Sequence, residues 1–282
     1  MNQLTPELIN QQLVDLACQK NSALDLAEVG LLLAAKSRPQ IKLDAYRRHL
    51  SKLVRDVKEF ASVADGHAPT LDLQRLALTE IICKRHGYGT DRTSFADPNG
   101  CNLSRVIDCR SGNPVIITLL YFYILTHNGW QATVIDFKPH LFIRLELNGE
   151  RLLINPAFGG KTLQAADLRS LVKATTGLGH ELAWDQLNTL TAGQLVARLQ
   201  QTISACWLHQ NNPQQALEAL LSALLIFPKS DELWRETGLL QSSLGLKQDA
   251  VQSLEKWHHL TDDINRHSET LTILRRLQTL NL

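Results

Sequence analysis

The sequence lacks the features typical of membrane, nucleic-acid-binding and secreted proteins. Its first residues contain no basic segment followed by an apolar run, and its most apolar run, residues 115–125, is too short to span a bilayer. The 29 Lys and Arg residues balance 28 Asp and Glu residues, and no basic block interrupts this balance. The five cysteines show no CxxC spacing. We therefore expect a reduced, cytoplasmic setting, with no nucleic-acid or membrane partner.

Motifs for common cofactors and metals are also missing. The chain contains neither GxGxxG nor GxxxxGK[ST], which hold dinucleotides and phosphates. Its ten histidines do not form the HxxxH or HExxH spacing of a zinc site. We expect no cofactor and no metal ion.

The most apolar stretch predicts a central helix. Ser111 and Asn113 are candidate N-caps, and Pro114 suits the first turn, where its missing N–H costs nothing. Asn128-Gly129 provides the stop signal. Because nearly every residue between these limits is apolar up to Leu125, the helix should be enclosed by protein on most sides.

A β-hairpin should follow this helix, because Asn148-Gly149 lies between two apolar segments. A two-residue loop fixes which residues face each other: apolar pairs share one face, and Glu146 meets Arg151 on the other. The same register brings His140 diagonally close to Asn155. The further predicted pairs are Leu145 with Leu152, Ile143 with Ile154 and Phe142 with Asn155.

The rest of the N-terminal part is predicted to be mainly helical. Helical periodicity covers residues 4–19, 24–37, 42–62 and 71–87, with a turn at 63–69. A polar loop is predicted at 88–102, and short helices follow at 103–110 and 160–177.

Beyond residue 197 the sequence repeats itself. A shift of 34 residues places Leu199 on Leu233, Ala216 on Ala250 and Leu220 on Leu254. This period is typical of tetratricopeptide helix-turn-helix repeats. Two units, 198–231 and 232–265, would be followed by a capping helix at 265–280. Because so few repeats rarely stand alone, we expect the pair to dock on the preceding domain.

A helix, a strand with His and a neighbouring strand with Asp or Asn form the core of papain-like and transglutaminase-like thiol enzymes, which this stretch resembles. The resemblance implies a nucleophilic Cys at the N-terminus of the helix, where the macrodipole lowers the pKa of the thiol. Here Gly112-Asn113-Pro114 occupies the position of the family's Gly-x-Cys, ahead of Gly129-Trp130-Gln131-Ala132. The expected nucleophile position is therefore Pro114.

More specifically, the chain resembles the bacterial SirB1 family, in which a transglutaminase-like domain precedes tetratricopeptide repeats. Arg110-Ser-Gly-Asn-Pro114 matches that family's Arg-x-Gly-x-Pro, and Pro139-His140 matches its Pro-Gly-His without the glycine. Asn155-Pro156 with Gly159-Gly160 matches Asp-Pro-Phe-x-Gly-Gly, and Asp97-Pro98 falls where the family has Asp-Pro-Arg-Asn.

The resemblance implies an α+β fold in two parts. Residues 1–177 would form a mainly helical transglutaminase-like domain, of the papain-like thiol fold, with a small antiparallel sheet. Residues 178–196 would be a linker, and 197–282 an all-α domain of tetratricopeptide-like repeats.

The departures from the pattern point away from catalysis. Pro114 cannot act as a nucleophile, and Asn155 in place of Asp would stabilise an imidazolium at His140 only weakly. The first hypothesis is therefore a non-catalytic interaction or regulatory protein, a pseudo-enzyme. Its C-terminal repeats would bind a protein or peptide, with Trp207, Trp234 and Trp257 as possible anchors.

Two alternatives remain open. His140 would either belong to a residual binding site or act as a general base, or it would be a packed residue hydrogen-bonded to Asn155. Cys109, five residues before Pro114 and next to Arg110, could instead serve with His140 and Asn155 in a cysteine hydrolase or acyl transferase. That arrangement requires the Cys109 sulfur to lie within about 6 Å of the His140 ring.

Overall fold

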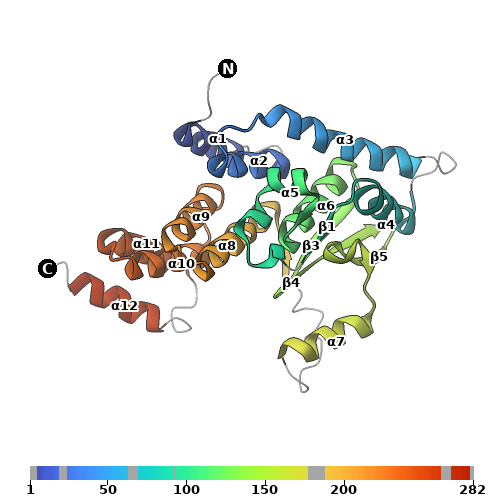
Figure 1. The fold of residues 1–282 in the computed structure, drawn as a ribbon. Coiled ribbons are helices and arrows are strands. Elements are labelled where there is room, and N and C mark those ends of the chain that lie inside the picture. The colour runs from blue at the N-terminus through green and yellow to red at the C-terminus, as the bar shows by residue number, and fades with distance from the viewer. Residues whose placement is uncertain are drawn as a thin grey trace.

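The computed structural model describes residues 5–18, 24–62, 69–91, 93–176, 188–261 and 268–279. Helices surround a small sheet in the middle of the molecule, and helical hairpins follow towards the C-terminus (Figure 1). The predicted α+β fold class is confirmed, with a mostly helical domain around an antiparallel sheet.

The N-terminal helices form at the predicted places. They are α1 (Pro6–Cys18), α2 (Leu26–Ser37), α3 (Leu43–Ser62) and α4 (Leu71–Leu78). Asp25 starts α2 because its side chain accepts hydrogen bonds from the backbone N–H groups of Ala27 and Glu28. The turn predicted at 63–69 lies almost wholly outside the described residues.

The segment after α4 departs from the prediction of one continuous α-helix. Residues Thr79–Arg85 form a π-helix, η1, and the N–H of His86 donates to the carbonyl of Ile81. Hydrophobic spacing over seven residues does not separate an α-turn from a π-turn, so this change could not be predicted from the residue pattern. The π-helix also makes a long-range contact. The Thr79 hydroxyl at its start donates a hydrogen bond to the Gly159 carbonyl at 2.9 Å.

Short elements occupy the predicted polar loop. A parallel pair joins β1 (Gly89–Thr90) to β2 (Ser111–Gly112), and between them lie the 3-10 turns η2 (Thr93–Phe95) and η3 (Pro98–Cys101). The helix predicted at 103–110 is α5 (Leu103–Cys109). These short elements connect η1 to the start of the central helix.

The central helix is α6 (Pro114–His127), as predicted. Its buried residues cover nearly its full circumference, and helices α2, α3 and α8 and strands β3 and β4 all pack against it. The helix lies at the centre of the main hydrophobic core, which accounts for its uniformly apolar sequence.

The sheet has five strands in the order β6-β5-β4-β3-β7. These strands are β3 (Gln131–Phe137), β4 (His140–Leu147), β5 (Glu150–Asn155), β6 (Lys161–Thr162) and β7 (Asn188–Leu190). The predicted register is confirmed for the pairs Ile143–Ile154, Leu145–Leu152 and Glu146–Arg151. Ladder pairing of β4 with β5 ends at Ile143–Ile154, one position before the predicted Phe142–Asn155 pair.

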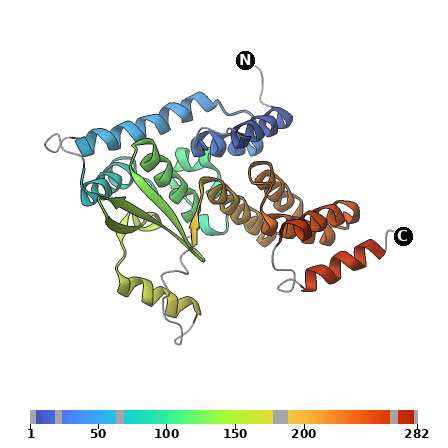
Figure 2. The same cartoon turned by 180° about the vertical axis from the view of Figure 1, so that it is seen from behind.

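The two faces of the sheet serve different cores. Val134, Ile143 and Leu145 belong to the main core around α6. Ile135 and Phe142 point the other way and pack with Leu168 of α7 (Ala165–Thr176), which lies below the sheet (Figures 1 and 2). Strict alternation of the strand residues produces this division.

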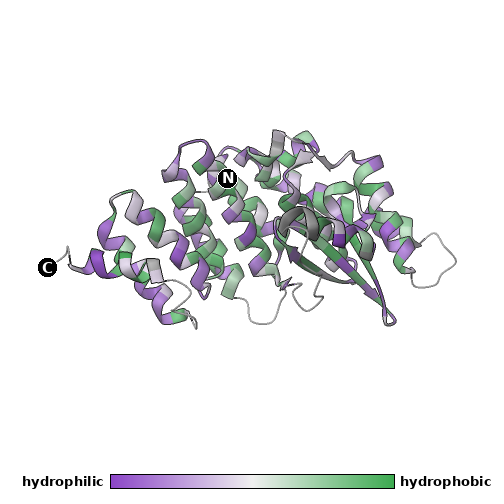
Figure 3. Cartoon of the chain, turned by 90° about the horizontal axis from the view of Figure 1, so that it is seen from below, coloured by the Kyte–Doolittle hydropathy of each residue, from purple (hydrophilic) through white to green (hydrophobic). Residues whose placement is uncertain are grey.

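The C-terminal part consists of helical hairpins. Its helices are α8 (Ala192–His209), α9 (Pro213–Ile226), α10 (Asp231–Ser243), α11 (Lys247–Leu260) and α12 (Ser268–Thr279). Helices α9 and α11 are offset by 34 residues at both ends, as are the last residues of α8 and α10. Each helix mixes hydrophilic and hydrophobic residues along its length, which fits helices with one buried side (Figure 3).

Helix α8 (Ala192–His209) crosses residue 197, where the sequence was expected to pass from linker to repeats. Strand β7 and the first turn of α8 lie within the segment that the sequence analysis assigned to a linker, while residues 177–187 lie outside the described part. Leu195, Val196 and Leu199 of α8 join the main core around α6. The first helix of the hairpins is thus built into the N-terminal domain.

No helix in the described ranges is long and apolar enough to cross a membrane.

Candidate functional site

The N-terminus of α6 is held in place by short-range contacts. Asn113 caps the helix, because its Oδ1 accepts a hydrogen bond from the N–H of Val115 at 3.1 Å, and its Nδ2 donates to the Phe95 carbonyl. At Gly112, an added Cβ would lie 2.8 Å from a side-chain carbon of Val106, so only glycine fits this close approach. The chain enters α6 at a fixed point, and the first helical residue there is Pro114.

His140 lies at the end of a tight connection between β3 and β4. It pairs with Phe137 across the turn, and the Lys138-Pro139 peptide bond in the turn is cis. The imidazole stacks on Phe142 with 6.0 Å between ring centroids. Burial lowers the pKa of His140, and the ring makes no side-chain hydrogen bond within the described part of the chain.

Asn155 ends β5 and begins the 3-10 turn η4 (Pro156–Phe158). Its Oδ1 accepts a hydrogen bond from the N–H of Ala157 at 3.0 Å. The predicted hydrogen bond between His140 and Asn155 does not form among the described residues, because the amide oxygen serves as a local cap.

Pro114, His140 and Asn155 nevertheless meet at the wall of one cavity. Its volume is about 450 Å³, which is within the range of small-molecule sites. The start of α6, the start of β4 and the end of β5 form one side, and α8 closes the other. The remaining lining residues are Thr90, Phe95, Asn113, Val115, Pro139, Leu141, Ala157, Phe158, Arg198, Gln201, Thr202 and Ala205.

Among the described residues that line this cavity, none offers a cysteine thiol or an unengaged hydroxyl. None of the five cysteines of the chain is among its lining residues. The two hydroxyls that line it are engaged with backbone, because Thr90 donates to the Ala157 carbonyl at 2.9 Å and Thr202 donates to the Arg198 carbonyl at 2.8 Å. The lining residues that the structure describes therefore include no cysteine and no hydroxyl that is free of a backbone contact.

Cys109 lies elsewhere. It is the last residue of α5, exposed, and outside the wall that carries His140 and Asn155. Arg110, which was expected to favour a thiolate, turns its guanidinium towards Tyr88 and His49 instead. The structure does not bring Cys109 into the candidate site.

The three tryptophans differ in exposure, because Trp257 is buried while Trp207 and Trp234 are half-buried. Trp257 is fully buried between the C-terminal helices. Trp234 donates from Nε1 to the Pro228 carbonyl and carries the Lys256 ammonium over its ring at 4.1 Å. Trp207 lines a small cavity of about 120 Å³ between the N-terminal helices and α8–α9.

The wall contributed by α8 was missed by the sequence analysis. Arg198, Gln201, Thr202 and Ala205 are spaced as neighbours on one helical face, a pattern visible in the sequence. The sequence does not show that this face of α8 lines the cavity, because the packing of α8 against α6 is not encoded in a local pattern. Phe95 and Phe158 were also missed, although both are large apolar residues that remain exposed.

Within the described ranges, no three His, Cys, Asp or Glu side chains gather as a set that could hold a metal ion.

Comparison with known proteins agrees with this geometry. Residues 44–201, more than half of the chain, match the family described as "Transglutaminase-like superfamily". The chain belongs to this superfamily. The matched segment runs from α3 into α8 and contains all the cavity-lining residues except Thr202 and Ala205.

Several bacterial relatives resemble the chain over most of its length. A UPF0162 protein of Xylella fastidiosa (strain Temecula1) is 23% identical, covering 87% of each chain. A UPF0162 protein of Vibrio cholerae is 21% identical, covering 86% of this chain and 88% of the relative. The UPF0162 protein YchA of Escherichia coli (strain K12) is 23% identical over 60% of this chain and 62% of its own.

Proposed function

We propose that this superfamily member is a non-catalytic interaction or regulatory protein of the SirB1 type. In this proposal a degenerate transglutaminase-like domain is joined to tetratricopeptide-like repeats, and the former active-site cavity is used for binding. The absence of any free nucleophile from the cavity wall carries the proposal.

The position of Pro114 supports this reading. In thiol enzymes of this architecture, the nucleophile sits where the helix dipole favours a negative charge. At this point the chain has a saturated ring with neither an ionisable group nor a backbone N–H. A base at His140 would therefore have no thiol to deprotonate at this position. The Asn155 amide oxygen is used to cap the η4 turn.

The helical hairpins support the binding half of the proposal. A second hollow of about 490 Å³ lies between α8 and α10, and it shares Arg198, Gln201 and Ala205 with the cavity. Its other lining residues include the apolar Leu208, Leu239 and Leu240. A continuous concave surface of this kind suits an extended protein segment.

Photo-crosslinking in cells tests the proposal. A photoreactive phenylalanine analogue placed at Phe158 should capture a defined protein partner, because this side chain is 71% exposed at the cavity rim. The same analogue at Phe60 of α3, which packs against the main core and does not line the cavity, gives the background. Ala205→Trp should abolish capture, since Ala205 is exposed and lies between the two hollows.

A matched substitution controls for the added indole. Ala45→Trp places the same group on the exposed side of α3 and should leave capture unchanged. Equal capture by the Ala205→Trp and Ala45→Trp variants would contradict use of this surface. No observation favours the cysteine hydrolase or acyl transferase alternative, because Cys109 does not line the cavity.

A further inference from the structure

We propose that the cavity binds a carboxylate attached to an apolar group, with Arg198 as the charged anchor. This inference rests on the proposed binding role and names the chemistry of the ligand. A small organic acid and the carboxyl terminus of a peptide share this chemistry, and the test below separates them.

The cavity wall carries a positive charge without a matching negative one. Arg198 is half-buried, and the lining residues include no Asp or Glu. Arg198 forms no ion pair or side-chain hydrogen bond within the described residues. Because a guanidinium stays charged at all physiological pH values, its position at a cavity favours an anionic ligand.

Nearby acids do not neutralise this charge. Glu232 of α10 lies 3.8 Å from Lys138, and Glu236 accepts a hydrogen bond from Gln201 at 3.0 Å. Asp136 of β3 interacts electrostatically with Arg198, but no ion pair joins the two within the described residues, and Asp136 does not line the cavity. Arg198 is therefore free to bind a ligand.

Other uncommitted groups on the wall are hydrogen-bond donors. Asn155 uses its Oδ1 for Ala157, which leaves the Nδ2 group available. The His140 ring has no hydrogen-bond partner among the described residues, and a neutral imidazole can donate from one nitrogen. Asn113 is occupied at both ends of its amide. Donors from β4, β5 and α8 thus outnumber free acceptors, which suits two carboxylate oxygens.

The rest of the cavity suits an apolar group. Phe95 and Phe158 stand at the wall with 52% and 71% of their surface exposed. Pro114, Val115 and Leu141 form the floor where a thiol enzyme would hold its nucleophile. Exposed aromatic residues beside an open cavity are typical of ligand sites.

Isothermal titration calorimetry on the full chain tests the inference with acid–amide pairs. The probes are octanoate with octanamide, 4-phenylbutyrate with its amide, and an acetylated pentapeptide ending in leucine with its C-terminal amide. We expect at least one acid to bind ten times or more tightly than its amide. Equal binding of acid and amide in all three pairs, or no binding at all, would overturn the inference.

Arginine variants test whether Arg198 supplies the positive charge that binds the carboxylate. Arg198→Gln should lower the affinity for the acid by about tenfold or more while leaving the affinity for the amide unchanged. Arg48→Gln makes the same change on the exposed side of α3 and should alter neither affinity. An acid–amide ratio unaffected by Arg198→Gln would also overturn the inference.

The pattern of binding identifies the source of the carboxylate. Binding of the peptide acid alone indicates a peptide terminus, and binding of all the acids indicates a general carboxylate site. Mass spectrometry of the peptide after incubation gives an independent outcome for the proposed function. A cleaved peptide would contradict the non-catalytic role whatever the affinities are, whereas an intact peptide, together with no preference for any of the three acids over its amide, would overturn only this inference.

Discussion

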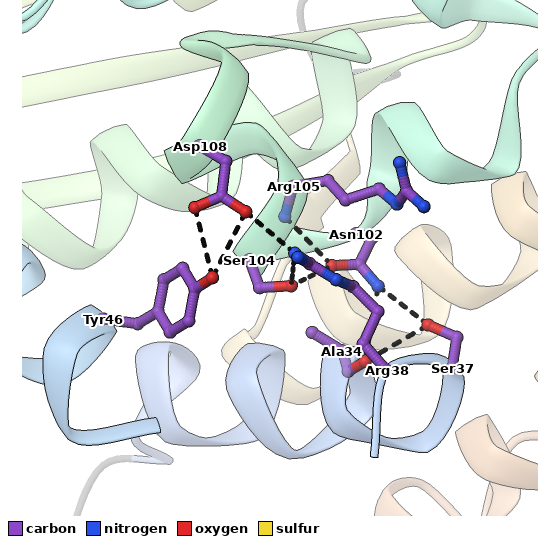
Figure 4. Close-up of polar contacts among 8 residues, drawn as sticks. All are labelled: Ala34, Ser37, Arg38, Tyr46, Asn102, Ser104, Arg105 and Asp108. Carbon is purple, nitrogen blue, oxygen red and sulfur yellow. Dashed lines mark hydrogen bonds and ion pairs between the residues drawn. The ribbon is translucent and has the colours of Figure 1, made fainter. Parts of the chain in front are cut away.

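Two groups of polar side chains flank the segment that leads into α6, and they differ in how they are satisfied. On one side lies a clamp network of Arg38, Tyr46, Asn102, Ser104 and Asp108, in which every side chain has a hydrogen-bond partner (Figure 4). On the other side lie the cavity donors Arg198, His140 and Asn155 Nδ2, which have none within the described residues.

The difference separates structural from binding roles. Buried polar groups in folded proteins are nearly always paired, because an unpaired group costs about 1–3 kcal/mol. The clamp network joins α2 and α3 to α5 and fixes the chain before Gly112 (Figure 4). The cavity donors join no other element through their side chains within the described residues, which is the observation behind the proposed ligand. The predictions that follow test this comparison by removing groups from each side.

The largest effect is expected at Asn102. Its side chain caps α5 by accepting from the N–H of Arg105 at 3.2 Å, accepts from the buried Ser104 hydroxyl at 2.7 Å and donates to Ser37 at 2.8 Å. Asn102→Ala should lower the free energy of unfolding by about 2–3 kcal/mol, measured by urea denaturation. Asn99→Ala, on an exposed turn, should change it by less than about 0.5 kcal/mol. Equal losses in both variants would contradict the structural role of the network.

A matched pair of arginine substitutions compares the two groups directly. Arg38 donates to Ser104 at 2.8 Å and to Asp108 at 2.9 Å, whereas Arg198 has no such partners. Arg38→Gln should cost about 1–2 kcal/mol of stability, reduced by partial exposure, and Arg198→Gln less than about 0.5 kcal/mol. Urea denaturation of both variants at pH 7 measures the difference. A cost at Arg198 equal to that at Arg38 would mean that Arg198 is structural as well.

Local patterns in the sequence predicted the helix start and the strands that carry Pro114, His140 and Asn155. They did not predict the cavity wall that α8 contributes. Asn148-Gly149 fixed the β4–β5 register because turn chemistry and strand alternation are short-range, and Asn113-Pro114 fixed the start of α6 for the same reason. The role of Arg198 was not predictable, because it depends on the packing of α8 against α6, some 80 residues apart in the chain.

The same limit applies to the individual roles at the site. The sequence placed His140 beside Asn155 but could not show that the Asn155 amide oxygen caps η4 instead of bonding the imidazole. Strand β7 was not predicted, because a strand of three residues carries too little pattern to recognise.

A third cluster extends the comparison to pH. The Nε2 atom of His49 lies 2.8 Å from both the Tyr88 hydroxyl and an Arg110 guanidinium nitrogen, so it accepts hydrogen bonds as a neutral ring. Burial, followed by the charges of Arg110, His86 and Lys52, lowers the pKa of His49 to about 4, while Asp56 opposes this shift.

The sign of the resulting pH effect follows from linkage. Between about pH 6.5 and 4 the unfolded chain binds a proton at His49 that the folded chain does not, so the stability falls as the pH falls through this window. From pH 7 to pH 5 we expect His49 to account for a loss of about 1 kcal/mol, allowing for its half-exposed ring. Urea denaturation of His49→Gln should show a correspondingly smaller decline over this range. An unchanged decline in the variant would remove His49 as the cause.

The smallest effect is expected at Cys109. Cys109 ends α5 and Cys18 ends α1, and both thiols are exposed, so the two form a natural comparison. Iodoacetamide should label them at rates within about threefold of each other from pH 6 to 9, followed by peptide mass spectrometry. Pro114→Cys provides the positive control, because a thiol placed at the N-terminus of α6 beside His140 should react faster than either at pH 6. A Cys109 that reacts more than tenfold faster than Cys18 at pH 6, and that loses this advantage in His140→Ala, would restore the thiol-enzyme alternative. Equal labelling rates for Cys109 and Cys18 would mean that Cys109 supplies no reactive sulfur to the cavity.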